Sequence, residues 1–436
     1  MFTAKMARRV RLRLYYYHLK KCAGTTMNSW LDTLSPAARL YNPAWQVGGG
    51  DSWFLHGDQL YPDTDIGRAI FYWSDVVHGH APLRAYAPAE SFCFTMLRDP
   101  VQRLISQFTD WRRLLPEDVA QLEGGIRACV LATKTMPLSE YLACHGARFA
   151  RPLYDNHLTR ALAATRWGSS AMRTPEAGPL LGEALQALHA DYHFVGITEQ
   201  FDSGRNALCA LLGLPPCGPA EPLNRSRAPH ESGPALWLSP ADEARFTQYD
   251  RIVYDAACRL FAQRHGALGE SYDAAAFERE HAAGLLGQLR ATQADGAARY
   301  SVSDPFYGTG LHQRDGGFSG PHAVWTVSGR RASLYMPVPP GMPVRLLLWI
   351  RGYAGAAQRA MLRVWADGRE VAPSFEQVED YAEVLAIPHL AAAGFARLEL
   401  ELPHCPAEDA DDTRPRGLSF DAYGWRPIER EPPAPP

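Results

Sequence analysis

Residues 12–34, LRLYYYHLKKCAGTTMNSWLDTL, predict the local arrangement on which the first part of the chain is built. The run LRLYYYHL (12–19) is short and aromatic, which is typical of a buried strand. A polar turn with a glycine follows it. Apolar residues then recur at the spacing of one helical face: Met27, Trp30, Leu31 and Leu34. The stretch therefore predicts a strand, a loop and a helix, in that order.

The same order recurs around residue 97. SFCFTML (91–97) is a compact apolar run that predicts a buried strand, and RDPVQRLISQF follows it. Asp99 is a favourable N-cap, and Pro100 at the first helical position loses no hydrogen bond, because that N–H would lack a helical partner. We therefore expect a second strand, loop and helix here.

A third unit begins with YHFVGITE (192–199) and continues into a helix that we expect Asp202 or Ser203 to cap. One apolar face of that helix is expected to contain Ala207, Leu208, Leu211 and Leu212. Three strand-then-helix units favour an α/β domain with a central parallel sheet. Further helical patterns would cover this sheet at residues 116–133, 180–190, 240–265 and 271–293.

The pattern changes after about residue 300. Short apolar runs, several of them alternating, are separated by turn sequences such as PPG, DG and AG. This predicts an all-β sandwich, or jelly-roll-like module. We therefore expect a domain over 1–268, a helical linker over 269–304 and a β-sandwich domain over 305–436.

Composition excludes several classes of protein. The chain has 436 residues, of which 46% are hydrophobic and 21% charged, so global disorder is excluded. No stretch of about 18 uncharged apolar residues is present, which predicts no membrane span. The first residues lack the apolar region of a secretory signal, so we expect a cytoplasmic protein.

The net charge and the spacing of the cysteines limit the ligands and the kinds of site that we expect. The net charge of −3 gives no global electrostatic reason to bind nucleic acid, so any anion site must be local. The eight cysteines form no CxxC pair, which fits neither a zinc site nor a disulfide scaffold. We expect reduced thiols that lie mostly in the core. The sequence leaves the oligomeric state open.

The loop HLKKCAGTT (18–26) has the chemistry of an anion site. Backbone N–H groups at a helix N-terminus attract phosphate, a glycine allows close approach of the backbone, and hydroxyl groups add donors. Lys21 precedes Gly24, whereas the lysine of a Walker A loop follows its second glycine, so a nucleoside triphosphatase or kinase is disfavoured. The alternative is an ordinary loop with a capping threonine.

A second anion-binding candidate lies after the strand at 91–97. Arg98 stands at the carboxyl end of that strand, and Ser106 lies about two turns into the next helix. Ligands of open α/β sheets bind outside these strand ends, so an arginine with a hydroxyl partner is well placed to bind phosphate. The alternative is an arginine that only caps a helix or forms an ion pair.

Together the two segments resemble the sulfotransferases that use 3′-phosphoadenosine 5′-phosphosulfate (PAPS), in particular the carbohydrate 2-O-sulfotransferases of the heparan and dermatan type (sulfotransferase family 2). Lys21 to Thr26 are similar to the 5′-phosphosulfate loop, and LRDPVQRLISQF is similar to the 3′-phosphate segment. Further pieces follow in the family's order: VVHGH at 76–80, YDNHLTR at 154–160, FVGITEQFD at 194–202 and LNRSR at 223–227. The resemblance covers about residues 12–265 and not the β-rich region.

The chain departs from the family at two places. Lys20 stands where a proline usually precedes the lysine, and Cys22 and Ala23 follow Lys21 where the family has Thr-Gly or similar. The segment that corresponds to D-N-x-Q-T-R lacks the glutamine, because Leu158 occupies its place.

The resemblance implies a P-loop-like three-layer domain that transfers a sulfuryl group from PAPS and leaves 3′-phosphoadenosine 5′-phosphate (PAP), with no metal required. It implies these donor-binding residues: Lys21, Cys22, Ala23, Gly24, Thr25, Thr26, Arg98, Ser106, Asn224 and Ser226. Lys21 would also relieve charge on the leaving phosphate. Asn156, Arg160, Arg225 and His78 would face the acceptor.

His78-Gly79-His80 supplies two candidates for the base, because a neutral imidazole suits removal of a hydroxyl proton. The resemblance favours His80 as the base and gives His78 a supporting role. Two alternatives are a pair of zinc ligands, for which no third ligand stands at a recognisable spacing, and two buried structural histidines.

We expect the acceptor to be a hydroxyl of a saccharide, in a glycan, glycoconjugate or polysaccharide. The β-sandwich could bind such a glycan, which is an analogy at the level of architecture only. The alternatives are a sulfotransferase for tyrosine, a lipid or a small molecule, and a nucleotide- or glycan-binding protein without catalysis.

Overall fold

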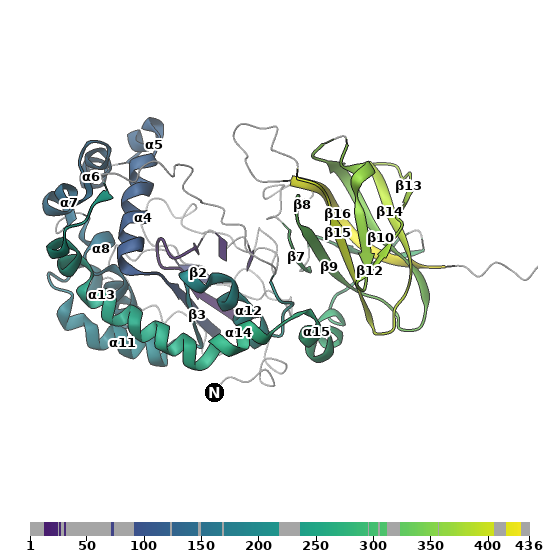
Figure 1. Cartoon of the computed structure of the whole chain (residues 1–436), viewed down its shortest axis with the longest axis horizontal. Helices are drawn as coiled ribbons and strands as arrows, with labels where there is room; N and C mark the ends of the chain where they lie inside the picture. The colour runs from purple at the N-terminus through teal and green to yellow at the C-terminus, as the bar shows by residue number, and fades with distance from the viewer. Residues whose placement is uncertain are drawn as a thin grey trace, which may run out of the picture.

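The computed structural model describes residues 13–24, 26–27, 30–31, 71–73, 91–122, 124–146, 150–167, 170–217, 236–294, 296–303, 306–311, 323–355, 357–404 and 416–428. Figure 1 shows a helix-rich part around a small sheet and a β-rich part at the other end, with α15 (Ala274–Phe277) drawn between them. Among the described residues, no helix combines the length and apolar character needed to cross a membrane.

The helix-rich part contains a four-stranded sheet in the order β2-β1-β3-β4. The strands are β1 (Arg13–Tyr17), β2 (Phe71–Trp73), β3 (Ser91–Leu97) and β4 (Phe194–Ile197). Every pairing between them is parallel, with Tyr17 opposite Thr95 and Leu97 opposite Ile197. Three of these strands were predicted from apolar runs, and the parallel sheet with flanking helices is confirmed.

Helices surround this sheet. The longer helices are α4 (Pro100–Arg113), α6 (Gly124–Thr135), α9 (His157–Trp167), α11 (Leu181–Ala190), α12 (Phe201–Leu212) and α13 (Pro240–Phe261). Shorter ones are α5 (Pro116–Ala120), α7 (Leu138–Tyr141), α8 (Arg151–Tyr154), α10 (Ser170–Arg173), α14 (Ala267–Ser271) and α16 (Ala283–Leu286). Helices α9, α11, α12 and α13 share a core of buried apolar residues with β1, β3 and β4, whereas α4, α6, α7 and α8 contribute to a second buried cluster.

The helix starts test the capping predictions. Asp99 caps α4 as predicted, because its side chain accepts a hydrogen bond from the Gln102 N–H at 2.9 Å and Pro100 opens the helix. The predicted cap of α12 at Asp202 or Ser203 is wrong. A 3-10 turn over Thr198–Gln200 is already helical and leads directly into α12, so Asp202 lies in the first turn.

The β-rich part consists of two antiparallel sheets. The larger has the order β13-β14-β10-β16-β6-β5, with β8 also paired to β16, and the smaller has the order β12-β11-β15-β9-β7. The larger sheet is formed by β5 (Thr292–Ala294), β6 (Ala297–Ser301), β8 (Val324–Val327), β10 (Pro343–Tyr353), β13 (Ser374–Glu376), β14 (Glu383–Leu390) and β16 (Arg416–Pro427). The smaller is formed by β7 (Tyr307–Thr309), β9 (Arg331–Pro337), β11 (Arg363–Ala366), β12 (Arg369–Val371) and β15 (Phe395–Glu401).

Apolar side chains of both sheets form one buried cluster, which includes Leu346 and Leu348 of β10 and Leu398 of β15. This is the packing of a β-sandwich, as the alternating runs predicted. Strands β5 and β6 lie within the predicted linker 269–304 and belong to the larger sheet.

The helical segment before the sandwich packs against it directly. The ring of Phe277 in α15 meets that of Tyr335 in β9 edge to face, with ring centroids 5.1 Å apart. Beside them, Arg397 Nη1 lies 2.6 Å from Glu278 Oε1, and the Tyr335 hydroxyl donates to the same carboxylate at 3.2 Å. These contacts fix the sandwich to the end of the helical region.

His265 should make the stability of the protein sensitive to acid. It is 8% exposed and packs against Phe194 with ring centroids 5.0 Å apart. Burial, with a smaller effect of Arg264, lowers its pKa to about 4. His265 therefore takes up a proton near pH 6.5 in the unfolded chain but only near pH 4 in the native protein. The free energy of unfolding should fall as the pH falls from 6.5 to about 4.

Between pH 7 and pH 5 we expect His265 to lower the free energy of unfolding by about 2 kcal/mol, because each pH unit below 6.5 contributes ~1.4 kcal/mol. Urea unfolding of His265→Gln should show this component removed. His189→Gln, an exposed histidine in α11, is the matched control and should keep the wild-type pH dependence. Equal acid sensitivity of all three proteins would contradict the assignment.

Candidate anion-binding site

The candidate site lies where the parallel strands end. Because β1, β3 and β4 run in the same direction, the loops that follow them meet at one edge of the sheet. The loop after β1 contains Lys21, the turn after β3 contains Arg98, and the turn after β4 contains Glu199. The topology thus brings together residues that lie more than 170 positions apart in the sequence.

The backbone after β1 has an unusual conformation. Lys21 and Ala23 both have positive φ angles, 65° and 61°, on either side of Cys22. Alternation of this kind is typical of concave anion-binding nests, although here the Cys22 N–H already donates to Leu19 O at 3.3 Å. Gly24 is required here, because an added Cβ would lie 1.6 Å from Nε2 of His18.

Cys22 offers neither a side chain nor a free N–H to this site, and Ala23 can contribute only through its backbone or its methyl group. The Cys22 side chain is fully buried in the core, and burial raises the pKa of its thiol to about 12. The thiol is therefore neutral and faces away from solvent. The Met27 N–H donates to Ala23 O at 3.1 Å, which starts the helical turn after the loop.

The structure brings the two predicted anion-binding segments into contact. Arg98 Nη1 donates to the Lys21 carbonyl oxygen at 3.4 Å. The Lys21 ammonium reaches α4, where its Nζ lies 2.6 Å from Asp110 Oδ1. Ser106 is half-buried one turn before Asp110 on the same helix. Lys21, Arg98 and α4 with Ser106 therefore border one region at the sheet edge.

Asp110, the ion-pair partner of Lys21, was not predicted as a site residue. Its carboxylate is 51% exposed and would be displaced from Lys21, or share it, if an anion bound to the loop. The signal was available in the sequence, because Asp110 stands four residues after Ser106 and shares its helical face.

Side chains from the 3-10 turn after β4 and from α13 fix the turn that contains Arg98. The Asp99 N–H donates to Glu199 Oε1 at 3.0 Å, and Glu199 Oε2 accepts from the Tyr254 hydroxyl at 2.9 Å. Asp99 also pairs with Arg251, with 2.5 Å between Nη1 and Oδ2. Each of these residues constrains the peptide next to Arg98. The sequence identified Asp99 as a helix cap but not its contacts with Glu199 and Arg251, because these residues come from distant elements.

Two residues expected to face the acceptor have structural roles instead. Arg160 is completely buried, and its guanidinium donates to the Asp155 carboxylate at 2.7 Å and to Thr174 O at 2.6 Å. Asn156 is 1% exposed, and its Oδ1 accepts from the Tyr249 N–H at 2.9 Å. Both side chains are buried and hydrogen-bonded to neighbouring protein groups, so neither is available to contact an acceptor as predicted.

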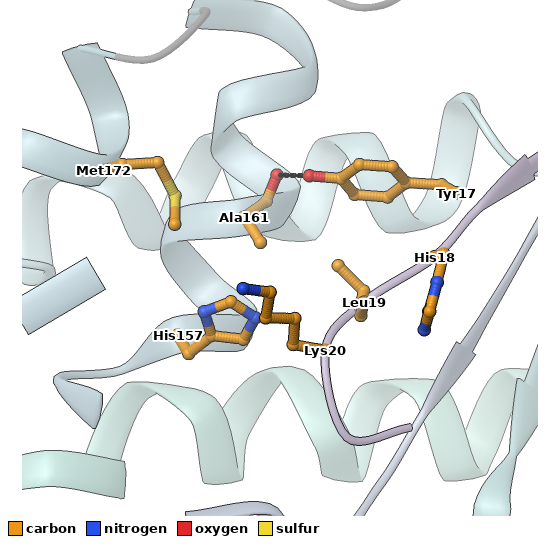
Figure 2. Close-up of a pocket in the computed structure, with 7 residues that line it drawn as sticks. All are labelled: Tyr17, His18, Leu19, Lys20, His157, Ala161 and Met172. Atoms are coloured by element: carbon orange, nitrogen blue, oxygen red, sulfur yellow. Dashed lines mark hydrogen bonds between the residues drawn. The ribbon is translucent and has the colours of Figure 1, made fainter. Parts of the chain in front are cut away.

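A small cavity lies beside the loop after β1 (Figure 2). Its volume is about 10 Å³, enough for a single water molecule and far too small for a nucleotide. Its lining includes Lys20, His157 and Tyr17, and the Tyr17 hydroxyl donates to Ala161 O at 2.6 Å. The His157 Nδ1 lies 2.6 Å from Pro152 O, which orients the ring.

Several predicted site residues lie outside the described part of the chain: Thr25, His78, His80, Asn224, Arg225 and Ser226. Their roles stay predictions. Within the described residues, no group of three or more histidine, cysteine, aspartate or glutamate side chains is arranged to hold a metal ion.

Comparison with known proteins establishes no family for this chain. No protein-family model matches it, and no curated protein matches it. Among solved structures, it is similar to a family 35 carbohydrate-binding module from Clostridium thermocellum, with 12% identity over 30% of this chain and 98% of the module, at a TM-score of 0.21.

A GH26-CBM35 β-(1,4)-mannanase from Podospora anserina is 15% identical over 32% of this chain, at a TM-score of 0.23. A cycloisomaltooligosaccharide glucanotransferase from a Paenibacillus species is 13% identical over 31%, at a TM-score of 0.20. The aligned part spans 29% of the first protein and 19% of the second. At these TM-scores the likenesses do not support an argument about function.

Removal of the Asp110 carboxylate should strengthen anion binding. In Asp110→Asn, Lys21 no longer has a competing carboxylate, so we expect about two- to fivefold tighter binding of inorganic pyrophosphate, because an exposed ion pair contributes up to ~1 kcal/mol. Calorimetric titration measures this. Glu117→Gln, an exposed charge change in α5, is the control, and the gain should disappear when Lys21→Ala is added. An unchanged affinity in Asp110→Asn would contradict the competition.

Arg160→Ala should destabilise the protein rather than weaken acceptor binding. It removes the ion-pair partner of the Asp155 carboxylate and the donor to several carbonyl oxygens, so we expect the free energy of unfolding in urea to fall by about 3–5 kcal/mol. Arg127→Ala, an exposed arginine of α6, should change the stability by no more than about 0.5 kcal/mol. A loss of the same small size in Arg160→Ala would show that the buried network is dispensable.

Proposed function

We propose that the protein is a PAPS-dependent sulfotransferase that transfers a sulfuryl group to a hydroxyl of a saccharide. The observation that carries the proposal is the contact between the two segments that resemble the family's phosphate-binding motifs. Arg98 Nη1 lies 3.4 Å from the Lys21 carbonyl at the carboxyl edge of a parallel sheet. The finer description, a P-loop-like three-layer sulfotransferase fold, is part of this proposal.

The residues present fit the donor. Its 5′-phosphosulfate needs backbone N–H groups and one mobile cation, which the positive-φ loop and Lys21 offer. Its 3′-phosphate needs a forked donor and a hydroxyl, which Arg98 and Ser106 offer. The first turn of α4 adds the positive end of its helix dipole, although the aspartate cap Asp99 offsets part of it.

The chain's own groups then have distinct tasks. PAPS supplies an already activated sulfuryl group, and the transfer forms a bond from the acceptor oxygen to sulfur as the bond from sulfur to the phosphate oxygen breaks. Lys21 would neutralise the charge that develops on that phosphate, and Arg98 would hold the nucleotide in line. The proton of the acceptor hydroxyl would pass to His80, with His78 beside it.

The contacts among Glu199, Asp99 and Arg251 stabilise the turn on which Arg98 lies. They fix the backbone of the turn that contains Arg98, so that this part of the chain does not need to be ordered when the donor binds. Lys21, in contrast, would exchange the carboxylate of Asp110 for the donor. Binding would therefore combine an arginine on a fixed turn with a lysine that changes its partner.

The saccharide acceptor rests on the resemblance to carbohydrate sulfotransferases. The sandwich, fixed to the helical part through Glu278 and Arg397, could hold a long glycan near the transfer site. A sulfotransferase for tyrosine, a lipid or a small molecule, or a binding protein without catalysis, are the alternatives. A screen of acceptors with labelled PAPS distinguishes them.

The donor site can be tested before the acceptor is known. PAP titrated into the wild-type protein without added metal should bind more tightly than ADP, because only PAP has a 3′-phosphate. Arg98→Ala should weaken PAP at least about tenfold, since hydrogen bonds between charged groups contribute ~1.5–3 kcal/mol. ADP binding should change much less.

Arg113→Ala is the matched control, because Arg113 is an exposed arginine at the C-terminal end of α4, the helix that follows Arg98. It should leave the affinities for PAP and ADP unchanged. Equal binding of ADP and PAP by the wild-type protein, or no binding of either, would falsify the proposal. Turnover of PAPS should then be lost in Lys21→Ala and in His80→Ala.

A further inference from the structure

Two cysteines away from the candidate anion site lie close enough to react with each other. Cys209 lies in α12 and is buried, and Cys217 lies five residues beyond the end of that helix and is half-buried. Their Sγ atoms are 3.2 Å apart. A disulfide has an S–S distance of about 2.05 Å, so a small rotation of the side chains would suffice to form the bond.

The backbone around the pair holds the two thiols in place. Gly213 ends α12 with a φ angle of 67°, which reverses the chain, and the Leu214 N–H donates back to Cys209 O at 2.9 Å. The Cys217 N–H donates to Oδ1 of Asn206 at 2.8 Å. Asn206 precedes Cys209 by three residues in α12, so one helix turn positions both cysteines.

Neighbouring groups restrict the short connection further. Pro215 and Pro216 occupy the two positions before Cys217 and limit its backbone freedom. The Tyr272 hydroxyl donates to Leu214 O at 2.8 Å in a buried position. The thiols therefore meet because of the fixed path of the chain, and the contact does not require a movement of the backbone.

We propose that Cys209 and Cys217 are a modification site that forms a reversible intrachain disulfide by exchange with a low-molecular-weight disulfide such as glutathione disulfide. The Cys217 thiolate attacks one sulfur of the oxidant, and one glutathione thiolate leaves and takes up a proton. Cys209 then loses its proton and attacks Cys217 Sγ, and the second glutathione leaves. Two protein thiols are oxidised and one disulfide is reduced to two thiols.

The order of the two steps follows from the surroundings. Burial acts to raise the pKa of Cys217, but the hydrogen bond from Cys209 and the positive charge of Arg205 outweigh it, so the pKa is lowered. The pKa of Cys209 is raised, chiefly by burial. Cys217, which is also the more accessible, is thus the thiol that reacts first with the oxidant, and Cys209 resolves the mixed disulfide.

The sequence makes the test direct, because trypsin releases both cysteines in one peptide, Asn206–Arg225, with no third cysteine. The reduced full-length protein is treated with glutathione disulfide until exposed Cys144 has become glutathionylated, and is then denatured and alkylated. We expect the peptide to be about 2 Da lighter than its reduced form and to take up no alkyl group, because two hydrogens have been lost. Dithiothreitol should restore two alkylation sites.

Two variants distinguish the specific disulfide between Cys209 and Cys217 from nonspecific oxidation of thiols. In Cys209→Ser, Cys217 should retain glutathione, because the resolving thiol is absent. Asn206→Ala keeps both thiols but removes the hydrogen bond that positions Cys217, and should accumulate more of the mixed disulfide than the wild type. Two alkylated cysteines, or stable glutathione on Cys217, in a wild-type protein whose Cys144 is modified would overturn the proposal.

Discussion

The parallel pairing of β1 with β3 is the constraint on which the candidate site depends. Tyr17 lies opposite Thr95, and the buried Thr95 hydroxyl donates to Tyr17 O at 2.8 Å, so the two strands end in register. Lys21 and Arg98 each follow closely after these residues. Lys21 and Arg98 therefore lie close together because the two strands end in register, although their like charges do not attract each other.

Helix α13 stabilises this geometry from behind the sheet edge. Arg251 and Tyr254 hold the turn after β3 through Asp99 and Glu199. Asp250 of the same helix accepts N–H groups of Leu158 and Thr159 at the start of α9. One long helix thus positions both the turn of Arg98 and the helix that contains buried Arg160, which couples the site to the core.

Sequence reasoning succeeded where a local signal decides the structure. The apolar run 91–97 became β3 with the same bounds, and Asp99 with Pro100 started α4 as their capping preferences indicate. It failed where two local signals compete, as at the start of α12, where a 3-10 turn extends the helix upstream of Asp202. β2 has only three residues and gave no recognisable pattern.

The sequence by itself determined the strand-loop-helix order and the change to antiparallel strands, because periodicity and capping are local. It also determined that a lysine and an arginine each follow a strand. Only the tertiary structure decided what these charges contact. Arg160 and Arg98 are the same residue type in comparable motifs, yet one is enclosed by carbonyl oxygens from α10 and beyond while the other lies half-buried at the sheet edge. Burial and partners depend on elements distant in sequence, which no local pattern contains.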